Sequence, residues 1–239
     1  MFRLRIIAGP NGSGKTTLTK DLQNNYHINF GYYINADEIE TWIKKNDRLS
    51  FGRYKLKVAA QVFDSFFTAH PLYQKCASVS YHIRRNIFYL DTRLKNFSYF
   101  SALFADFIRY QLMKSNQTFT FETVMSGKDK VSFLKKAKEN NYRMYLYYIC
   151  TDDVLINKDR VADRVEKGGH AVPDEKIEKR YYGSLKNLFN AIKLSNRAYL
   201  FDNSGSTHKL VAEITDGRII NFDPEFVPKW FAKYVLSKL

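Results

Sequence analysis

Short apolar runs alternate with longer amphipathic segments over most of the chain. Five runs are rich in β-branched or aromatic residues and have the length of buried strands; they are 3–8, 31–38, 118–124, 143–150 and 197–203. Helical periodicity fills several of the intervals, as in KDKVSFLKKAKENN, which ends in two asparagines, a residue type that tolerates a left-handed cap. Strands that alternate with helices predict an α/β fold with a mostly parallel sheet between two layers of helices.

The remaining segments define the expected domain organisation, a single domain over 1–239. Residues 47–114 are very aromatic, helical in character and longer than a strand–helix–strand crossover requires, which predicts an inserted helical subdomain. Residues 152–196 contain two helical stretches separated by the helix-breaking sequence GGHAVP. Residues 207–239 predict a hairpin that turns at Asp216-Gly217, followed by a helix.

Composition narrows the class of protein. The chain has 239 residues, of which 45% are apolar and 16% aromatic, and this excludes a disordered or collagen-like chain. No apolar run approaches the length of a membrane span, and the first residues lack a signal-peptide core, so we expect a cytoplasmic protein with no membrane partner. The net charge of +14 favours a phosphate-rich ligand, a nucleic acid or an acidic protein.

The first predicted strand is followed by GPNGSGKT, which matches the phosphate-binding pattern GxxxxGK[ST], or P-loop. With a strand before it and a helix after it, such a loop directs backbone N–H groups at phosphates, while Lys15 reaches the β and γ phosphates. The Thr16 hydroxyl is the expected Mg²⁺ ligand. A glycine-rich turn with a solvated lysine is the alternative. The pattern therefore predicts ATP and Mg²⁺ as cofactors, and the expected nucleotide-binding residues are Gly9, Pro10, Asn11, Gly12, Ser13, Gly14, Lys15, Thr16 and Thr17.

The acidic residues indicate what happens to the γ-phosphoryl group. A GTPase is excluded because NKDR at 157–160 replaces the guanine-selecting NKxD and precedes the DxxG sequence at 202–205. A motor or transporter ATPase needs an apolar strand that ends in Asp-Glu, and the nearest candidate, INADE, follows the P-loop too closely. That position suits a kinase, in which Asp37 is the general base for an acceptor hydroxyl. The alternative is that Asp37 caps the helix that follows.

Further candidates lie later in the chain. Glu122 and Thr123 end the third predicted strand, at the sheet edge where α/β proteins bind ligands, and are the expected acceptor-binding residues together with Asp37. Arg164 and Arg180 lie on the two paired helices, 152–196, which we expect to act as a lid that brings guanidinium groups to the γ-phosphoryl. Surface ion pairs are the alternative for these arginines and for Arg160. The expected catalytic residues are thus Lys15, Asp37, Arg164 and Arg180.

Several motifs in order resemble one family of kinases. GPNGSGKTT, INADE, FETVMSG, RVADRVEKGGHAVP with IEKRYYGSLKNL, and YLFDNSG are similar to the zeta-toxin-like P-loop kinases, in the chromosomal branch often labelled predicted ABC-type ATPase. The resemblance covers most of 3–46 and 118–205. It implies a P-loop NTPase fold, an ATP-dependent phosphotransferase with an alcohol acceptor such as a UDP-activated amino sugar, and a small antitoxin protein as partner. It also implies the site roles given above for Lys15, Thr16, Asp37, Glu122, Thr123, Arg164 and Arg180.

The segment from about Asp47 to Phe97 departs from that pattern by its length. An aromatic, basic insertion can accommodate a larger acceptor, bind an acidic partner or stack nucleic-acid bases. Packing of its aromatic residues into a local core is the alternative. The preferred hypothesis is therefore a kinase of a small metabolite, and the second is a nucleic-acid-associated ATPase or polynucleotide kinase.

Overall fold

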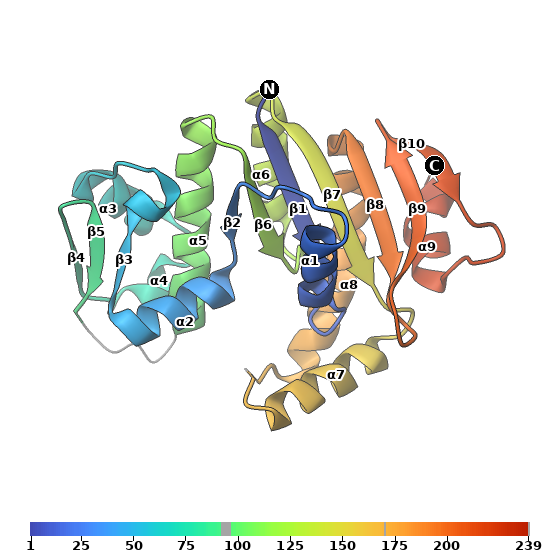
Figure 1. Ribbon diagram of the computed structural model, residues 1–239. Helices are drawn as coiled ribbons and strands as arrows, with labels where there is room; N and C mark the ends of the chain where they lie inside the picture. The colour runs from blue at the N-terminus through green and yellow to red at the C-terminus, as the bar shows by residue number, and fades with distance from the viewer. Residues whose placement is uncertain (92–96, 170, 239) are drawn as a thin grey trace. The chain divides into compact units, whose positions relative to one another are not determined.

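The computed structural model describes residues 1–91, 97–169 and 171–238 (Figure 1). Parts of the expected insertion, of the paired helices and of the C-terminal segment, namely 92–96, 170 and 239, lie outside the described residues. Contacts divide the chain into two compact units, of which unit 1 comprises 1–30 and 122–239 and unit 2 comprises 31–121. The second unit therefore begins before the expected insertion, at the second predicted strand.

Unit 1 holds both termini and most of the strands. Its elements in chain order are β1 (Arg3–Ala8), α1 (Lys15–Asn24), the last two residues of β6 (Phe119–Thr123), α6 (Lys128–Glu139), β7 (Arg143–Cys150), α7 (Val154–Glu166), α8 (Asp174–Leu194), β8 (Arg197–Asp202), β9 (Lys209–Thr215), β10 (Arg218–Phe222), α9 (Lys229–Tyr234) and the short 3₁₀ helix η2 (Leu236–Lys238). The strands fall where the apolar runs of this part of the sequence predict them.

The sheet of unit 1 has the strand order β10-β9-β8-β7-β1. β7 pairs in parallel with β1 and β8, whereas β9 and β10 add an antiparallel edge. The Gly9 N–H donates to the carbonyl oxygen of Thr123 over 3.3 Å, so the carboxyl ends of β1 and β6 lie together. α1 covers one face of this sheet and α6 and α8 cover the other (Figure 1). The expected α/β fold with a mostly parallel sheet and two helical layers is confirmed.

The central strands β1 and β7 form because most of their side chains are buried on both faces of the sheet. In β1, Leu4, Ile6 and Ile7 are fully buried, as expected for a central parallel strand. At the carboxyl end of β8, the Asp202 carboxylate accepts from Trp230 Nε1 over 2.8 Å, which fastens α9 to the sheet. Between β9 and β10 the turn residues Asp216 and Gly217 both have positive φ, as a two-residue hairpin turn requires.

Unit 2 contains helices and a second, smaller sheet. Its elements are β2 (Tyr32–Ile34), α2 (Ala36–Asn46), β3 (Arg48–Ser50), the 3₁₀ helix η1 (Phe51–Tyr54), α3 (Ala60–Ala69), α4 (Tyr73–Cys76), β4 (Tyr81–Arg84), β5 (Ile87–Leu90), α5 (Phe97–Lys114) and the first three residues of β6. β2 pairs in parallel with β6, and β3, β5 and β4 form an antiparallel sheet in that order. The described part of 47–114, where we expect a helical subdomain, contains the helices α3, α4 and α5 and also these three strands, which the sequence did not predict.

The aromatic residues of unit 2 build its core. Phe63 is fully buried and its ring packs against Phe67, Tyr81, Phe88, Phe104 and Phe107 at centroid distances between 4.9 and 6.0 Å. The small sheet supplies Tyr81 and Phe88, and α3 and α5 supply the others. Local packing thus accounts for the phenylalanines of this cluster. Buried rings present no face on which a nucleic-acid base can stack.

Candidate functional site

The P-loop connects β1 to α1 within unit 1. Gly14 precedes the first residue of α1 with a φ of 98°, and no side chain caps this helix end. The first turn of α1 also contains no acidic residue. Thr16 and Thr17 are exposed there. A helix N-terminus without a capping side chain or an acidic residue in its first turn has backbone N–H groups and a positive dipole end directed at an anion.

The Lys15 side chain folds back over the loop. Its ammonium donates to the carbonyl oxygen of Pro10 over 3.0 Å and lies 4.0 Å from the Glu122 carboxylate. The two side chains are only 10% and 12% exposed, so solvent screens this ion pair less than one on the surface. The structure therefore brings together the P-loop lysine and the acidic residue that ends β6, as their sequence positions predict.

Thr123 lies beside Glu122 and shapes the segment after β6. Its hydroxyl oxygen accepts from the Met125 N–H over 3.0 Å, which leaves the hydroxyl hydrogen for another acceptor. Met125 is buried with a φ of 58°, an uncommon conformation for a residue other than glycine. The Asn187 amide of α8 donates to the Met125 carbonyl over 2.9 Å and thereby holds this turn.

The two helices expected to act as a lid, α7 and α8, contact the P-loop through side chains. Arg180 of α8 donates to the side-chain oxygen of Asn11 over 3.3 Å, so one of the two expected lid arginines reaches the loop. Arg164 is exposed in the last turn of α7. Arg160 does not follow the ion-pair alternative, since it donates to the carbonyl oxygens of Asn203 over 2.7 Å and Gly205 over 3.0 Å.

Asp37 lies in unit 2, in the first turn of α2. The capping residue of this helix is Asn35, whose side chain accepts from the Asp37 N–H over 2.9 Å. The alternative in which Asp37 caps the helix is therefore wrong, because the cap stands two residues earlier. The Asp37 side chain is exposed and keeps its carboxylate for another partner.

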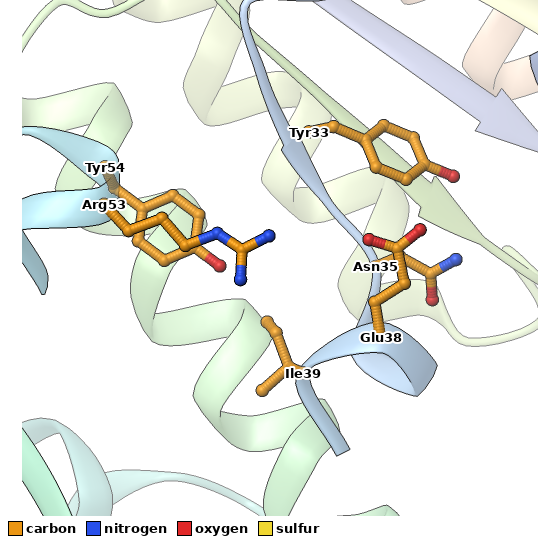
Figure 2. Close-up of a pocket in the computed structure, with 6 residues that line it drawn as sticks. All are labelled: Tyr33, Asn35, Glu38, Ile39, Arg53 and Tyr54. Carbon is orange, nitrogen blue, oxygen red and sulfur yellow. The ribbon is translucent and has the colours of Figure 1, made fainter. Parts of the chain in front are cut away.

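A small depression opens beside the start of α2 in unit 2. Figure 2 shows the six side chains that line it, which come from β2, the cap and first turn of α2, and η1: Tyr33, Asn35, Glu38, Ile39, Arg53 and Tyr54. Its cavity volume of about 10 Å³ has room for roughly one water molecule. Burial raises the pKa of Tyr54, and the Arg53 charge partly opposes this rise. The depression is too small to hold a sugar.

Buried titratable groups lie below the carboxyl end of β7. Burial raises the pKa of the Cys150 thiol and of the Tyr148 and Tyr181 phenols far above their ordinary values. The Tyr181 hydroxyl donates to the Thr151 carbonyl over 2.7 Å, and Tyr148 shares a hydrogen bond with Ser184 over 3.1 Å. These groups stay protonated at neutral pH and support the strand end from the interior.

The residues present fit a nucleotide polyphosphate. Beside the uncapped helix end, the Ser13 hydroxyl oxygen is buried with no hydrogen-bond partner. Lys15, Arg180 and the glycines of the loop supply charge and close backbone approach at the same place. Among the described residues, no cluster of three or more His, Cys, Asp or Glu side chains could hold a metal ion.

Two asparagines that the sequence did not single out also touch the loop. Asn157 of α7 and Asn203 after β8 each donate a side-chain amide to a P-loop carbonyl. Asn157 opens the sequence NKDR, which does not match the guanine-selecting pattern NKxD. Asn203 stands at the end of an apolar run that leads into the ligand-binding edge of the sheet, and that position is a signal that sequence reasoning can use.

Comparison with known proteins identifies the family. A family model described as zeta toxin matches residues 58–209, more than half of the chain, and the chain therefore belongs to the zeta toxin family. The matched residues include Glu122, Thr123, Arg164 and Arg180 and begin after the P-loop. The motif order in the sequence predicts this family, and the prediction is confirmed.

Solved structures share the fold at low identity. The crystal structure of AvrRxo1-ORF1:-ORF2 with ATP matches 98% of this chain and 63% of its own chain, with a TM-score of 0.56 and 14% identity. A structure of the PezAT chromosomal toxin–antitoxin system of Streptococcus pneumoniae matches 89% of this chain and 72% of its own, with a TM-score of 0.50 and 14% identity. At such identities the likeness shows the fold alone.

One curated relative matches part of the chain. An uncharacterized protein from Haemophilus influenzae is 35% identical over 69 residues, which is 29% of this chain. The chain spans about half of that relative, since the match covers 49% of its length. Among the described helices, none is both long and apolar enough to cross a membrane.

Proposed function

We propose that this chain is an ATP-dependent kinase that transfers the γ-phosphoryl group to a hydroxyl of a small metabolite. The observation that carries the proposal is the P-loop of unit 1, which leads into a helix N-terminus without a capping side chain. There Lys15 lies 4.0 Å from Glu122, and Arg180 donates to the side chain of Asn11. Membership of the zeta toxin family supports it, as does a structural relative that was solved with ATP.

Each of these residues has a definite task in this proposal. ATP supplies the phosphoryl group, and the Mg²⁺ that binds with it supplies positive charge that neutralises the phosphate oxygens. Lys15 binds phosphate oxygens once it leaves the Pro10 carbonyl, and Glu122 holds the ammonium group in place meanwhile. Thr16 would hold Mg²⁺ through its hydroxyl. Arg164 and Arg180 supply positive charge that matches the negative charge developing in the transition state.

The acceptor is recognised by the acidic and hydroxyl residues. Asp37 accepts the proton of the acceptor hydroxyl as its oxygen bonds to the γ-phosphorus, while the bond from that phosphorus to the bridging oxygen breaks and ADP leaves. Glu122 and Thr123 bind acceptor groups next to the P-loop. A UDP-activated amino sugar is the acceptor that the family resemblance implies. We further propose that the protein acts in the cytoplasm and is controlled by a small antitoxin protein, in keeping with the PezAT relative.

The nucleic-acid alternative has lost one of its two supports. It rested on the net charge of +14 and on an aromatic insertion, and the phenylalanines around Phe63 are buried in unit 2. Charge alone does not select nucleic acid over a nucleotide sugar. A salt titration separates the two, because binding to an oligonucleotide weakens steeply with salt.

The proposal is tested with γ-labelled ATP and UDP-N-acetylglucosamine as the acceptor, comparing the wild type with Lys15→Ala and Lys20→Ala. Lys20 is exposed on α1 and is a matched control for the loss of one positive charge. We expect transfer by the wild type and Lys20→Ala, and none by Lys15→Ala. Transfer by Lys15→Ala at the wild-type rate would contradict the role of the P-loop, and transfer to an oligonucleotide instead would favour the alternative.

A further inference from the structure

Two side-chain amides hold the P-loop by its carbonyl groups. Asn157 Nδ2 donates to the carbonyl oxygen of Asn11 over 2.5 Å, and Asn203 Nδ2 donates to the carbonyl oxygen of Ser13 over 2.9 Å. All four residues belong to unit 1. The donors are 146 and 190 residues from the carbonyls that they bind, so the loop is fixed by the fold around it.

The direction of each carbonyl sets the direction of an N–H group. The Asn11 carbonyl shares a peptide group with the Gly12 N–H, and the Ser13 carbonyl shares one with the Gly14 N–H. The described chain has no cis peptide bond, and in a trans peptide the C=O and N–H point in opposite directions. Hydrogen bonds from the asparagines therefore turn the Gly12 and Gly14 N–H groups away from the asparagines.

Glycine makes this close approach feasible. Gly12 and Gly14 have φ values of 75° and 98°, which other residues rarely adopt. A Cβ atom on Gly12 would collide with the backbone carbonyl of Asn157, and one on Gly14 would collide with the Asn203 amide. The two glycines and the two asparagines thus form one matched arrangement.

Neighbouring groups fix the asparagines in turn. Asn157 is fully buried, and the Thr151 hydroxyl donates to its Oδ1, which leaves Nδ2 directed at the loop. The Asn203 N–H donates to the Cys150 carbonyl over 2.8 Å, and the Asn203 carbonyl accepts from Arg160 over 2.7 Å. Asn157 and Arg160 lie three residues apart on α7, so this one helix supports both donors.

We propose that Asn157 and Asn203 are positioning residues that orient the Gly12 and Gly14 N–H groups as phosphate donors before a nucleotide binds. The inference rests on the proposed function and goes beyond it by assigning the shape of the loop to α7 and to the segment after β8. Groups that are oriented in advance lose less conformational freedom on binding, which raises affinity without any new contact.

The test removes each donor and keeps the side-chain shape. In Asn157→Asp and Asn203→Asp the carboxylate cannot donate and repels the carbonyl that the amide bound. Isothermal titration of each purified full-length protein with ATP and with ADP should show affinities weakened roughly ten- to hundredfold, the range expected for charge-assisted hydrogen bonds. Hydrogen–deuterium exchange should show that ATP protects residues 9–17 in the wild type and protects them far less in the variants.

Asn196→Asp is the matched control. Asn196 is half-buried just before β8, at the opposite end of that strand from Asn203, and its side-chain oxygen accepts from the Met144 N–H over 2.9 Å. Its amide also donates to Asp216 over 3.4 Å. The change should lower the melting temperature and leave ATP affinity and loop protection unchanged.

The outcomes separate the inference from the proposed function. A wild type that binds neither ATP nor ADP would contradict the proposed function itself. A wild type that binds, together with folded variants that bind within twofold of it, would overturn the positioning role and leave the function standing. An equal loss in Asn196→Asp would also overturn it, because general destabilisation would then explain the effect. If Asn157→Asp fails to fold, the half-buried Asn203 decides the matter through Asn203→Asp.

Discussion

Replacing Asp37 by asparagine separates its proposed chemistry from its place in a helix. Asn35 caps α2, so Asp37→Asn leaves the capping hydrogen bond of 2.9 Å intact. What remains is the loss of one negative charge in the first turn, where the helix dipole favours acids by about 0.3–1 kcal/mol. The free energy of unfolding should therefore fall by less than about 1 kcal/mol, and the melting temperature should fall by a few degrees at most.

The effect on phosphorylation should be much larger. An amide cannot take the proton of an acceptor hydroxyl, and general base catalysis contributes a factor of about 10² to 10⁴ in rate. ATP affinity should stay near the wild-type value, because the proposed phosphate ligands belong to the P-loop. The assay measures acceptor phosphorylation, thermal unfolding and ATP titration on one preparation of Asp37→Asn.

Glu38→Gln is the matched control for this change. Glu38 is the other acid in the first turn of α2 and is also exposed, so its loss costs a similar dipole interaction. We expect Glu38→Gln to reproduce the small loss of stability and to keep most of the activity. Near-normal phosphorylation by Asp37→Asn would exclude Asp37 as the general base and make Glu122 the next candidate base. Equal loss of activity in both variants would show that the charge of the helix end matters, and not proton transfer.

Three other perturbations follow from the structure. Arg180→Ala should lower kcat and also raise the KM for ATP, because Arg180 contacts the P-loop at Asn11, whereas Arg164→Ala should act chiefly on kcat. Steady-state kinetics with varied ATP checks both expectations. Unchanged kcat in both variants would contradict the lid role. Phe63→Ala should destabilise the protein by about 3–5 kcal/mol in denaturant unfolding, since it empties the centre of the unit 2 core; a loss below 1 kcal/mol would contradict that packing. The free energy of unfolding should fall as pH rises past 9.0 and then 10.0, the ordinary pKa values of thiol and phenol. The reason is that Cys150 and Tyr148 stay protonated in the folded protein at these pH values, whereas the same groups ionise in the unfolded chain. Melting temperatures that stay constant through this pH range would contradict the raised pKa values.

Much of the fold follows from local sequence patterns. Each of the five apolar runs contains a strand, although in 31–38 the strand β2 covers only Tyr32–Ile34 and α2 begins at Ala36. The agreement is best for β1 and β7, which are buried on both faces and so have few polar positions. The small sheet of unit 2 was missed because the aromatic residues around it also suit a helix. Its hairpin between β4 and β5 turns at Arg85 and Asn86, both with positive φ, and only the asparagine is typical of such a turn.

Only part of the candidate site can be predicted from the sequence. The P-loop and the proximity of Glu122 to Lys15 are predictable, since a short motif fixes the first and strand ends fix the second. The roles of Asn157 and Asn203 cannot be predicted, because each side chain binds a carbonyl more than a hundred residues away in the chain. Local sequence patterns carry no information about such a pairing. The alternative in which Asp37 caps α2 places the cap two residues too late, since Asn and Asp serve equally well as caps and Asn35 takes that position.

The most direct test of the central claim is mass spectrometry of a metabolite extract incubated with ATP and the purified protein. The expected result is a hydroxylated metabolite, proposed to be a UDP-activated amino sugar, that becomes heavier by one phosphate with the wild type and remains unchanged with Lys15→Ala. ATP consumption without any phosphorylated metabolite, or the same products from Lys15→Ala, would contradict it.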